Sequence, residues 1–558
     1  MPSKLSAVHA ALGIELPAER TANVRQPLQA PRHVVQSSKG RHLHLPEPAE
    51  FEGLLQVYWS EHNPFFPCMN RTDFQLAIHR WLSAAGYGPS STTVQILPKT
   101  MILAANLCMV LAIAEFVDPQ RVRKMSGSSV GQWVSGKQLH ETGSAILKHC
   151  EPPSHEQEID AIRFHILEAM YLVYVERLRQ ASAAIGVAVQ LTFRTGLHDQ
   201  SSWTDLAPTA VDSRRILFWC VYYMDRRISE KTGQPYLLRD EEVGVAEIYK
   251  PGSHEPSVLI NGDSESVAFN TAMCHYLQHI IDWAHLWTDI WDTLFSIRAQ
   301  KLVGDVGHHS RSIDHRIDRM LGQLPHELQW QREQHRSNPS RQEGERQARF
   351  ALLAYTRLNT AQLLLHHNPF SRVRASSNTL DLRLKKAVEM VNAIVLHLET
   401  FDTYSQLGQW ACAVLVECIY HIVPVVASNI SDSDRNKAVS ALHSIKALME
   451  NLSTSQGSAR RAQRALKRVF SVVERGDNEH LNDSTASAQK KSSAPHLQVS
   501  DGAERSMCSA ALPESPLSPW NIWSDWDFSS QMDSFFRLDE EAGARDQSFS
   551  PLIFTSLD

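Results

Sequence analysis

Residues 213–230 read SRRILFWCVYYMDRRISE, and this stretch decides how the 558-residue chain folds. Its apolar side chains recur at intervals of three and four residues, which is the spacing of one face of an α-helix. That face consists of Ile216, Trp219, Cys220, Tyr223 and Met224. Arg215, Asp225 and Arg226 fall beside it, so we expect them at the edges of the face, where ion pairs form with little desolvation. The stretch therefore predicts an amphipathic helix packed against a core.

Helical periodicity extends over most of the chain, and alternating runs of the kind that form strands are nearly absent. Prolines such as Pro152, Pro153 and Pro208 separate the helical stretches. No fixed repeat length appears, so a regular solenoid is not indicated. The sequence predicts an all-α fold, a large irregular helical array, with helices over residues 50–62, 72–84, 98–117, 133–150, 155–176, 179–196, 209–231, 265–299, 345–366, 378–401, 405–427, 435–453 and 457–474.

Composition divides the chain into three regions. Residues 1–48 are interrupted by prolines and charges and predict a flexible basic arm. Residues 49–475 carry the helical pattern and predict one regulatory domain. Residues 476–558 are rich in Ser, Asp, Ala and Pro, a composition typical of disorder.

Three further stretches accompany the opening one in a fixed order. They are LLQVYWSEHNPFFP at residues 54–67 with Arg71 and Phe74, TGLHD at 195–199, and TGQPYLLRDEEV at 232–243. Together the four stretches resemble the middle homology region of fungal zinc-cluster transcription factors, over roughly residues 50–430. The resemblance implies a nuclear regulator of transcription that controls metabolic genes, of the kind that regulates a secondary-metabolite biosynthetic gene cluster. It also implies a helical domain that regulates activity and forms a homo- or heterodimer.

The six-cysteine zinc cluster of that family has no counterpart in this sequence. Two zinc ions that share bridging sulfurs need six thiolates close together near the N-terminus, but the first cysteine here is Cys68. Cys412 and Cys418, the closest pair, fall on different faces of one predicted helix. We therefore predict no metal site and no cofactor. Three alternatives remain: the cluster is missing from this sequence, the protein reaches DNA through a partner, or another surface binds DNA.

The N-terminal arm is the candidate for direct DNA contact. No carboxylate occurs between residues 20 and 46, so the cations there would attract phosphates without specifying a base sequence. The alternative is a solvated linker. The candidate contacts are Arg20, Arg25, Arg32, Lys39 and Arg41.

The last 48 residues, from Ala511, combine nine carboxylates with eight aromatic side chains and only two arginines. Repulsion between the carboxylates keeps such a tail open, while its aromatic side chains remain available to a partner's apolar groove. This pattern predicts an acidic activation tail that recruits transcription machinery; the alternative is a short helix docked onto the helical domain. The candidate contacts are Trp523, Trp526, Phe528, Phe535 and Phe536.

A basic helical stretch near residue 460 has two readings. It is a solvated helix face or a contact for nuclear import or nucleic acid. Its cations are Arg460, Arg461, Arg464, Lys467 and Arg468.

Composition favours a soluble protein in a reducing compartment. The family resemblance implies that this compartment is the nucleus. No charged segment followed by an apolar run marks a secretory signal at the N-terminus, and the eight cysteines are scattered. The apolar run 101–114 is too short to cross a membrane, and residues 410–427 include Glu417 and His421. Both runs predict buried helices, and a net charge of −6 confines any DNA contact to a local patch.

Nothing in the sequence indicates an enzyme. Residues 127–131 match Gly-x-Ser-x-Gly, but the polar residues before them do not form the buried strand that a nucleophile elbow requires. The acidic run 240–242 lacks the second carboxylate cluster that magnesium-dependent all-α enzymes need. A small-molecule effector in a pocket between helices is a further hypothesis.

Overall fold

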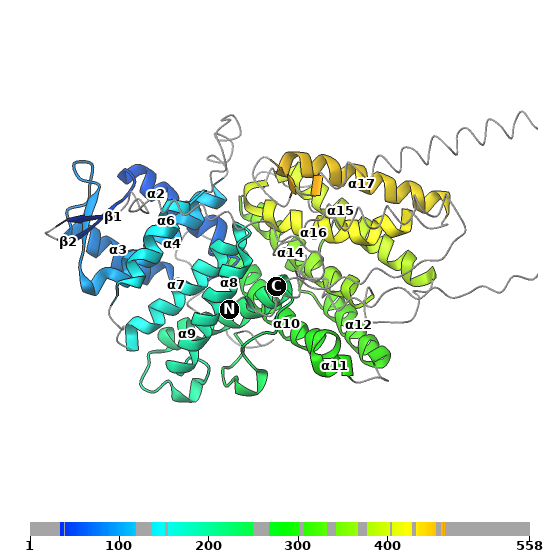
Figure 1. Cartoon of the computed structure of the whole chain (residues 1–558), viewed down its shortest axis with the longest axis horizontal. Helices are drawn as coiled ribbons and strands as arrows, with labels where there is room; N and C mark the ends of the chain where they lie inside the picture. Colours follow the sequence, from blue (N-terminus) through cyan, green and yellow to red (C-terminus); the bar gives the residue numbers. More distant parts are fainter. Residues whose placement is uncertain are drawn as a thin grey trace, which may run out of the picture.

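The computed structural model describes residues 34–37, 40–118, 135–150, 155–248, 267–301, 306–331, 342–366, 377–401, 404–426, 431–453, 459–460 and 462–463. Within these ranges the chain is predominantly helical, and the predicted all-α fold is confirmed. Figure 1 shows the helices α2 to α9 on one side of the molecule, α14 to α17 on the other, and α10 between them.

The first half of the fold surrounds one apolar helix, α4. Its neighbours α6 and α7 pack against it, and α8 packs against α7 on the side that leads to α9. The elements of this half are α2 (Pro48–Val57), the π-helix η1 (Tyr58–His62), α3 (Arg71–Ala84), η2 (Pro98–Thr100), α4 (Met101–Val117), α6 (Lys137–Lys148), α7 (His155–Tyr174), α8 (Leu178–Arg194), η3 (Gln200–Ser202) and α9 (Pro208–Thr232).

The second half continues from α9 through α10 into a layer of long helices. Helix α10 packs on α9 and α14, and α15, α16 and α17 pack on one another. The elements are η4 (Asp240–Glu242), α10 (Val267–Ile290), η6 (Trp291–Phe295), α11 (Ile297–Lys301), α12 (Val306–Gly322), η7 (His326–Leu328), α14 (Gln342–His366), α15 (Ser377–Phe401), α16 (Tyr404–Val426) and α17 (Asp432–Leu452).

A small antiparallel sheet, which we did not predict, lies beside α2 and α3. Its strand order is β1-β2-β3, formed by β1 (Val34–Ser37), β2 (Gly40–His44) and β3 (Thr93–Ile96). Arg41 pairs with Ile96, so the backbone of this predicted DNA contact belongs to the sheet rather than to a flexible arm. The strands have four or five residues each, and runs so short carry little alternation for a sequence pattern to reveal.

Helix α4 is the apolar run that we predicted to be buried. The stretch Pro98–Val117 is long and apolar enough to cross a membrane, the one such stretch among the described residues, and 78% of it is buried within the protein. A helix that is apolar on all sides and surrounded by other helices is a core element. The prediction of a buried helix is therefore confirmed for this run. The expectation that the run is too short to cross a membrane was wrong, because the apolar stretch extends beyond residues 101–114 at both ends.

Helix α9, which carries the opening stretch, is buried on more sides than an amphipathic helix. Besides the predicted apolar face, Leu217, Val221 and Tyr222 have no exposed surface. The expected position of two charges was wrong, because Asp225 is 2% exposed and Arg226 is 0% exposed. The two charges form an ion pair with each other, and each has further partners beyond the end of the helix: Asp240 for Arg226, and the amides of Leu237 and Leu238 for Asp225. Arg215 is half-buried and pairs with Asp212, as expected for an edge position.

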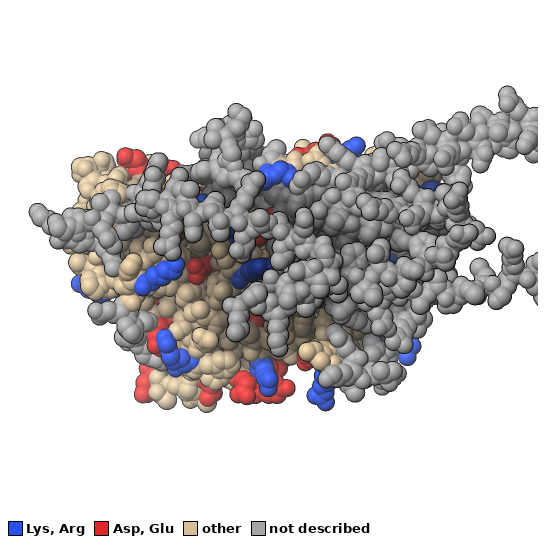
Figure 2. All heavy atoms as spheres, in the orientation of Figure 1, with Lys and Arg blue, Asp and Glu red and all other residues tan. Residues whose placement is uncertain are grey.

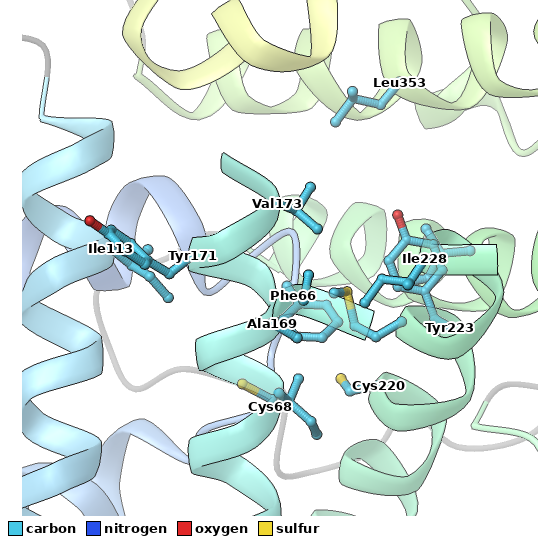
Figure 3. Close-up of a cluster of buried hydrophobic side chains, with 14 of the residues drawn as sticks. Phe66, Cys68, Ile113, Ala169, Tyr171, Val173, Cys220, Tyr223, Ile228 and Leu353 are labelled. Atoms are coloured by element: carbon cyan, nitrogen blue, oxygen red, sulfur yellow. The ribbon is translucent and has the colours of Figure 1, made fainter. Parts of the chain in front are cut away.

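The stretch 54–67 packs directly onto α9. Figure 3 shows Phe66 between Ala169 of α7 and Cys220 of α9, with Tyr223 and Ile228 nearby. The rings of Phe66 and Tyr223 lie 6.1 Å apart. Two of the sequence stretches that carry the family resemblance thus meet in one apolar cluster.

Two buried arginines of α14 join the halves. Arg349 donates to Glu61 of η1 at 2.6 Å, and its side chain is 2% exposed. Arg357 donates to Tyr223 of α9 at 3.0 Å and to Tyr276 of α10 at 3.4 Å. Because a buried charge needs such partners, these contacts fix α14 against the first half.

Most predicted helices match the structure to within a few residues. The exceptions are α12, which we did not predict, and the range 265–299, which is divided into α10, η6 and α11. Helix α12 has few apolar positions, Ile313 and Ile317 among them, within a run of charged and histidine residues. The helix predicted at 457–474 lies largely outside the described residues.

Candidate functional site

A buried guanidinium, that of Arg226, is the centre of a polar cluster between α9, η4 and α10. It donates to Asp225 Oδ2 at 2.9 Å, to Asp240 Oδ1 at 2.6 Å and to Thr288 Oγ1 at 3.2 Å. Its carbon also lies 3.8 Å from the centre of the Tyr222 ring, a cation–π contact. We call these five residues the Arg226 cluster.

Asp225 attaches the next segment of the chain to this cluster. Helix α9 ends at Gly233, whose φ of 64° turns the chain back along the helix. Asp225 then accepts hydrogen bonds from the backbone N–H groups of Leu237 and Leu238, at 2.9–3.0 Å. The stretch TGQPYLLRD therefore has a structural role. It turns the chain back along α9 so that two of its backbone N–H groups reach the buried carboxylate of Asp225.

Burial and hydrogen bonding set the charges of the cluster. Burial raises the pKa of Asp225, although the neighbouring Arg226 opposes this. Burial acts in the same direction on Asp240, but hydrogen bonds from His285 and Tyr222 and the charge of Arg226 outweigh it and lower the pKa of Asp240. Both oxygens of Asp240 thus already have partners within the protein, so the structure gives Asp240 of the acidic run 240–242 a structural role.

An open groove between α6, α7 and α8 is the larger candidate site. It encloses about 690 Å³, within the range of small-molecule pockets. We call it the α6–α8 groove. Its apolar lining comes from Ala145, Tyr171, Leu172, Val175, Ala183, Ala184 and Val187, and its polar lining from Lys137, His140, Glu141, Ser144, Lys148, His149, His165, Glu168, Arg177 and Gln180.

Glu168 forms the polar part of the groove floor. Its oxygens accept from Ser144 Oγ at 2.9 Å and His165 Nδ1 at 3.1 Å, and His140 Nε2 lies 3.5 Å away. Burial would raise the pKa of Glu168, but the hydrogen bonds from both histidines and Ser144 outweigh it and lower the pKa to about 2. The floor therefore carries a carboxylate that is ionised and already surrounded by donors.

A second, much smaller cavity lies where α9 meets α14 and α16. It encloses about 20 Å³ beside Lys231, Arg357 and Glu417, which is room for one water molecule. Burial lowers the pKa of Lys231 to about 8, an effect to which Arg227 adds. The cavity is too small for a metabolite, so the α6–α8 groove is the better ligand site.

Most of the residues predicted to contact partners lie outside the described part of the chain. This holds for Arg20, Arg25, Arg32 and Lys39, for the five tail aromatics, and for the Gly-x-Ser-x-Gly match at 127–131. Arg41 is placed by its backbone alone, in β2. Among the described residues that are visible in Figure 2, basic and acidic side chains are interspersed, and these residues form no broad basic field. The arm and tail assignments remain predictions.

Within the described ranges no disulfide joins the cysteines. Cys412 and Cys418 are buried in α16, and Cys412 contacts Met449 of α17 through its sulfur at 3.8 Å. Burial raises the pKa of Cys68 to about 12 and that of Cys108 to about 12. Within the described ranges no three His, Cys, Asp or Glu side chains are grouped as a metal ion would require.

From the sequence a pocket between helices was a hypothesis, but the groove itself could not be located, because its lining comes from three helices. One signal was present: Lys137, His140, Glu141, Ser144 and Lys148 recur at helical spacing and form one polar face. A polar face normally meets solvent, so the pattern alone did not distinguish a groove wall from an ordinary surface.

A comparison with protein families matches residues 55–304 to the fungal specific transcription factor domain. The matched range runs from α2 to α11 and includes α9, the Arg226 cluster and the α6–α8 groove. The predicted resemblance is thereby confirmed over residues 55–304, which match this domain.

Known relatives of the chain are named as fungal transcription factors. A probable transcription factor of Fusarium proliferatum is 34% identical over 17% of this chain and 14% of its own length. An ABC-transporter-regulating transcription factor of Aspergillus oryzae is 22% identical over 48% of this chain and 28% of its own. The terreic acid cluster-specific transcription factor of Aspergillus terreus is 21% identical over 34% and 27%. The chain thus spans less than a third of the length of each of these relatives.

Proposed function

We propose that the protein is a nuclear regulator of transcription that controls a set of metabolic genes, such as a secondary-metabolite biosynthetic gene cluster. The observation that carries the proposal is the family match over residues 55–304. The name of the Aspergillus terreus relative supports control of a gene cluster, and that of the Aspergillus oryzae relative supports control of transporter genes. In this proposal the helical body regulates and does no catalysis.

We further propose that residues 511–558 activate transcription. Fused to an unrelated DNA-binding module in yeast, this tail is expected to raise expression of a reporter gene about tenfold or more. Its five candidate aromatics would supply the apolar contacts to the transcription machinery, since aromatic anchors contribute most of the binding energy in such interfaces.

The matched control separates aromatic contacts from charge. Alanine at the five aromatic positions Trp523, Trp526, Phe528, Phe535 and Phe536 is expected to abolish activation, while alanine at Ser524, Ser529, Ser530, Gln531 and Ser534 is expected to leave it. An intact tail that leaves the reporter silent would remove the assignment.

The basic arm is proposed to contact DNA phosphates without reading sequence. The purified full chain is then expected to bind a random-sequence duplex, with an affinity that falls steeply as salt rises. Glutamine at the five arm cations should remove most of that salt dependence, because each phosphate contact contributes a slope of about −0.9. Binding measured by fluorescence anisotropy at several salt concentrations tests this.

The alternative is a co-regulator that has no DNA affinity of its own and acts through a DNA-bound partner. The feature that favours it is that this sequence contains no six-cysteine zinc cluster. Its first cysteine, Cys68, is buried in the helical body. A chain that binds promoter DNA only after nuclear extract is added would support this alternative. Binding by the purified chain alone would exclude it.

A further inference from the structure

We propose that the α6–α8 groove binds an amphipathic carboxylate, an aliphatic or aromatic acid about ten carbon atoms long. The groove has the volume of a small-molecule site and combines one apolar wall with cations at its rim. This inference goes beyond the proposed function, because binding to the groove requires neither DNA nor the tail.

The directions of the helices determine the shape of the groove. Tyr171 donates to Ser135 at the start of α6, whereas Ser144 reaches Glu168 further along, so α6 and α7 are antiparallel. Helices α7 and α8 are joined by a short turn and are also antiparallel, as the ion pair between Arg194 and Glu158 shows. Helices α6 and α8 therefore run in the same direction, and both begin at one end of the groove.

Cations line both ends of the groove, but the helix dipoles differ between the ends. Lys148 lies in the last turn of α6, where the negative end of the helix dipole offsets its charge. At the end where both helices begin, Lys137 and Arg177 are exposed at the rim, and Glu141 lies 3.7 Å from Lys137. The positive ends of the two helix dipoles add to the charge of these cations. Along α8 the lining then becomes apolar, through Ala183, Ala184 and Val187. An acid group fits the first end, and an apolar chain fits the rest.

The length of the apolar wall sets the size of the ligand. Ten residues separate Arg177 from Val187, which is about 15 Å along a helix. Val187 is 39% exposed, an unusual exposure for a valine in a helix interior. A chain of about ten carbons would cover this distance and bury that apolar surface.

Glu168 restricts where a charged head group can lie. Its carboxylate contacts His140 and Ser144 in the middle of α6, so it would repel an acid group placed over the middle of the groove. Of the two ends, the helix dipoles favour the one at Arg177. A cationic ligand gains little from Glu168, because Ser144 and His165 already donate to its oxygens. Cations at the rim would in addition repel such a ligand.

Three ten-carbon probes test the inference on the purified full chain. Decanoate, 1-decanol and decyltrimethylammonium share an apolar chain and differ in head-group charge. Calorimetric titration below the micelle concentration is expected to show decanoate binding about tenfold more tightly than decanol, which corresponds to about 1.4 kcal/mol. The ammonium compound is expected not to bind. Equal affinity for decanoate and decanol would overturn the proposal.

Matched variants locate the site. Ala183 is exposed on α8, so Ala183→Trp fills the groove with little cost to folding and is expected to abolish decanoate binding. Ala84→Trp adds the same ring at an exposed position of α3 and should leave binding intact. Arg177→Met is expected to weaken the binding of decanoate about tenfold without changing the affinity for decanol. Arg80→Met, at an exposed position of α3, should change neither affinity.

Two outcomes would identify a different occupant or none. Decanoate binding that survives Ala183→Trp would place the ligand elsewhere and sink the inference. Binding that appears only after the five tail aromatics are replaced by alanine would show that the acidic tail occupies the groove. Neither result depends on whether the protein regulates transcription, so the two proposals fail separately.

Discussion

Asp225→Ala is expected to lower the free energy of unfolding by about 3–5 kcal/mol, the cost of removing one partner from a buried ion pair. The carboxylate is 2% exposed, and its loss would leave Arg226 Nη1 and the N–H groups of Leu237 and Leu238 without their acceptor. A domain is commonly stable by only about 5–15 kcal/mol, so the loss is a large fraction of the total. Urea denaturation followed by tryptophan fluorescence measures it.

The matched control lies on the same helix. Asp212→Ala removes an ion pair to Arg215 at 3.2 Å, in which both side chains are about one-fifth exposed. Its expected cost is below about 1 kcal/mol, because partly exposed pairs contribute little. Equal losses for the two variants would contradict the view that burial gives the Arg226 cluster its importance.

Hydrogen exchange distinguishes a local effect from general destabilisation. In Asp225→Ala the amides of Leu237 and Leu238 are expected to lose protection first, since their acceptor is gone. Amides in the middle of α4, a helix that holds none of the hydrogen-bond partners of Asp225, should lose protection only to the extent that global stability falls. Protected amides at Leu237 and Leu238 in the variant would show that another group holds this segment.

The Arg226 cluster also marks the limit of what the sequence could reveal. Spacing of apolar residues in 213–230 correctly predicted α9, because a helical face repeats every three to four residues. The same reasoning placed Asp225 and Arg226 at the surface, since a charge without visible partners is expected in water. Besides the ion pair that these two neighbours form with each other, Arg226 has its partners Asp240 and Thr288 14 and 62 residues away along the chain, and no local pattern connects them.

Other differences have equally specific causes. Helix α12 was missed because its few apolar positions are embedded among charges, and the sheet was missed because its strands are short. The α6–α8 groove was hidden because Glu168, Ser144 and Arg177 are separated in the sequence and meet only when three helices pack. Sequence patterns identified most of the helices and the family resemblance. The groove could be seen only in the structure, because three helices must pack together to form it.

A second large effect is expected from acid, through two buried histidines. His62 of η1 is 1% exposed and His279 of α10 is 4% exposed. Burial lowers the pKa of each to about 3, and the charge of Arg357 adds to the effect at His279. In the unfolded chain the same rings titrate near 6.5. The unfolded state therefore binds more protons between these values, and stability must fall as pH drops below about 6.5.

Each histidine is expected to remove about 2 kcal/mol of stability between pH 7 and pH 5, because each pKa unit corresponds to about 1.4 kcal/mol. Glutamine at both positions keeps a polar side chain but no longer titrates. The double variant His62→Gln/His279→Gln should therefore lose about 4 kcal/mol less than the wild type over this range. Urea denaturation at pH 7, 6 and 5 measures the difference.

The comparison of slopes is needed because buried carboxyls act in the opposite direction. Burial raises the pKa of Asp282, for example, so protonation of this carboxyl stabilises the folded protein as pH falls. This contribution is the same in the wild type and in the variant. His79→Gln, at a position exposed on α3, is the control and should keep the wild-type slope. A double variant with an unchanged slope would mean that His62 and His279 take up protons in the folded state. In that case Tyr174, which lies 3.1 Å from His62 Nδ1, would have to accept a hydrogen bond from a charged ring inside the core.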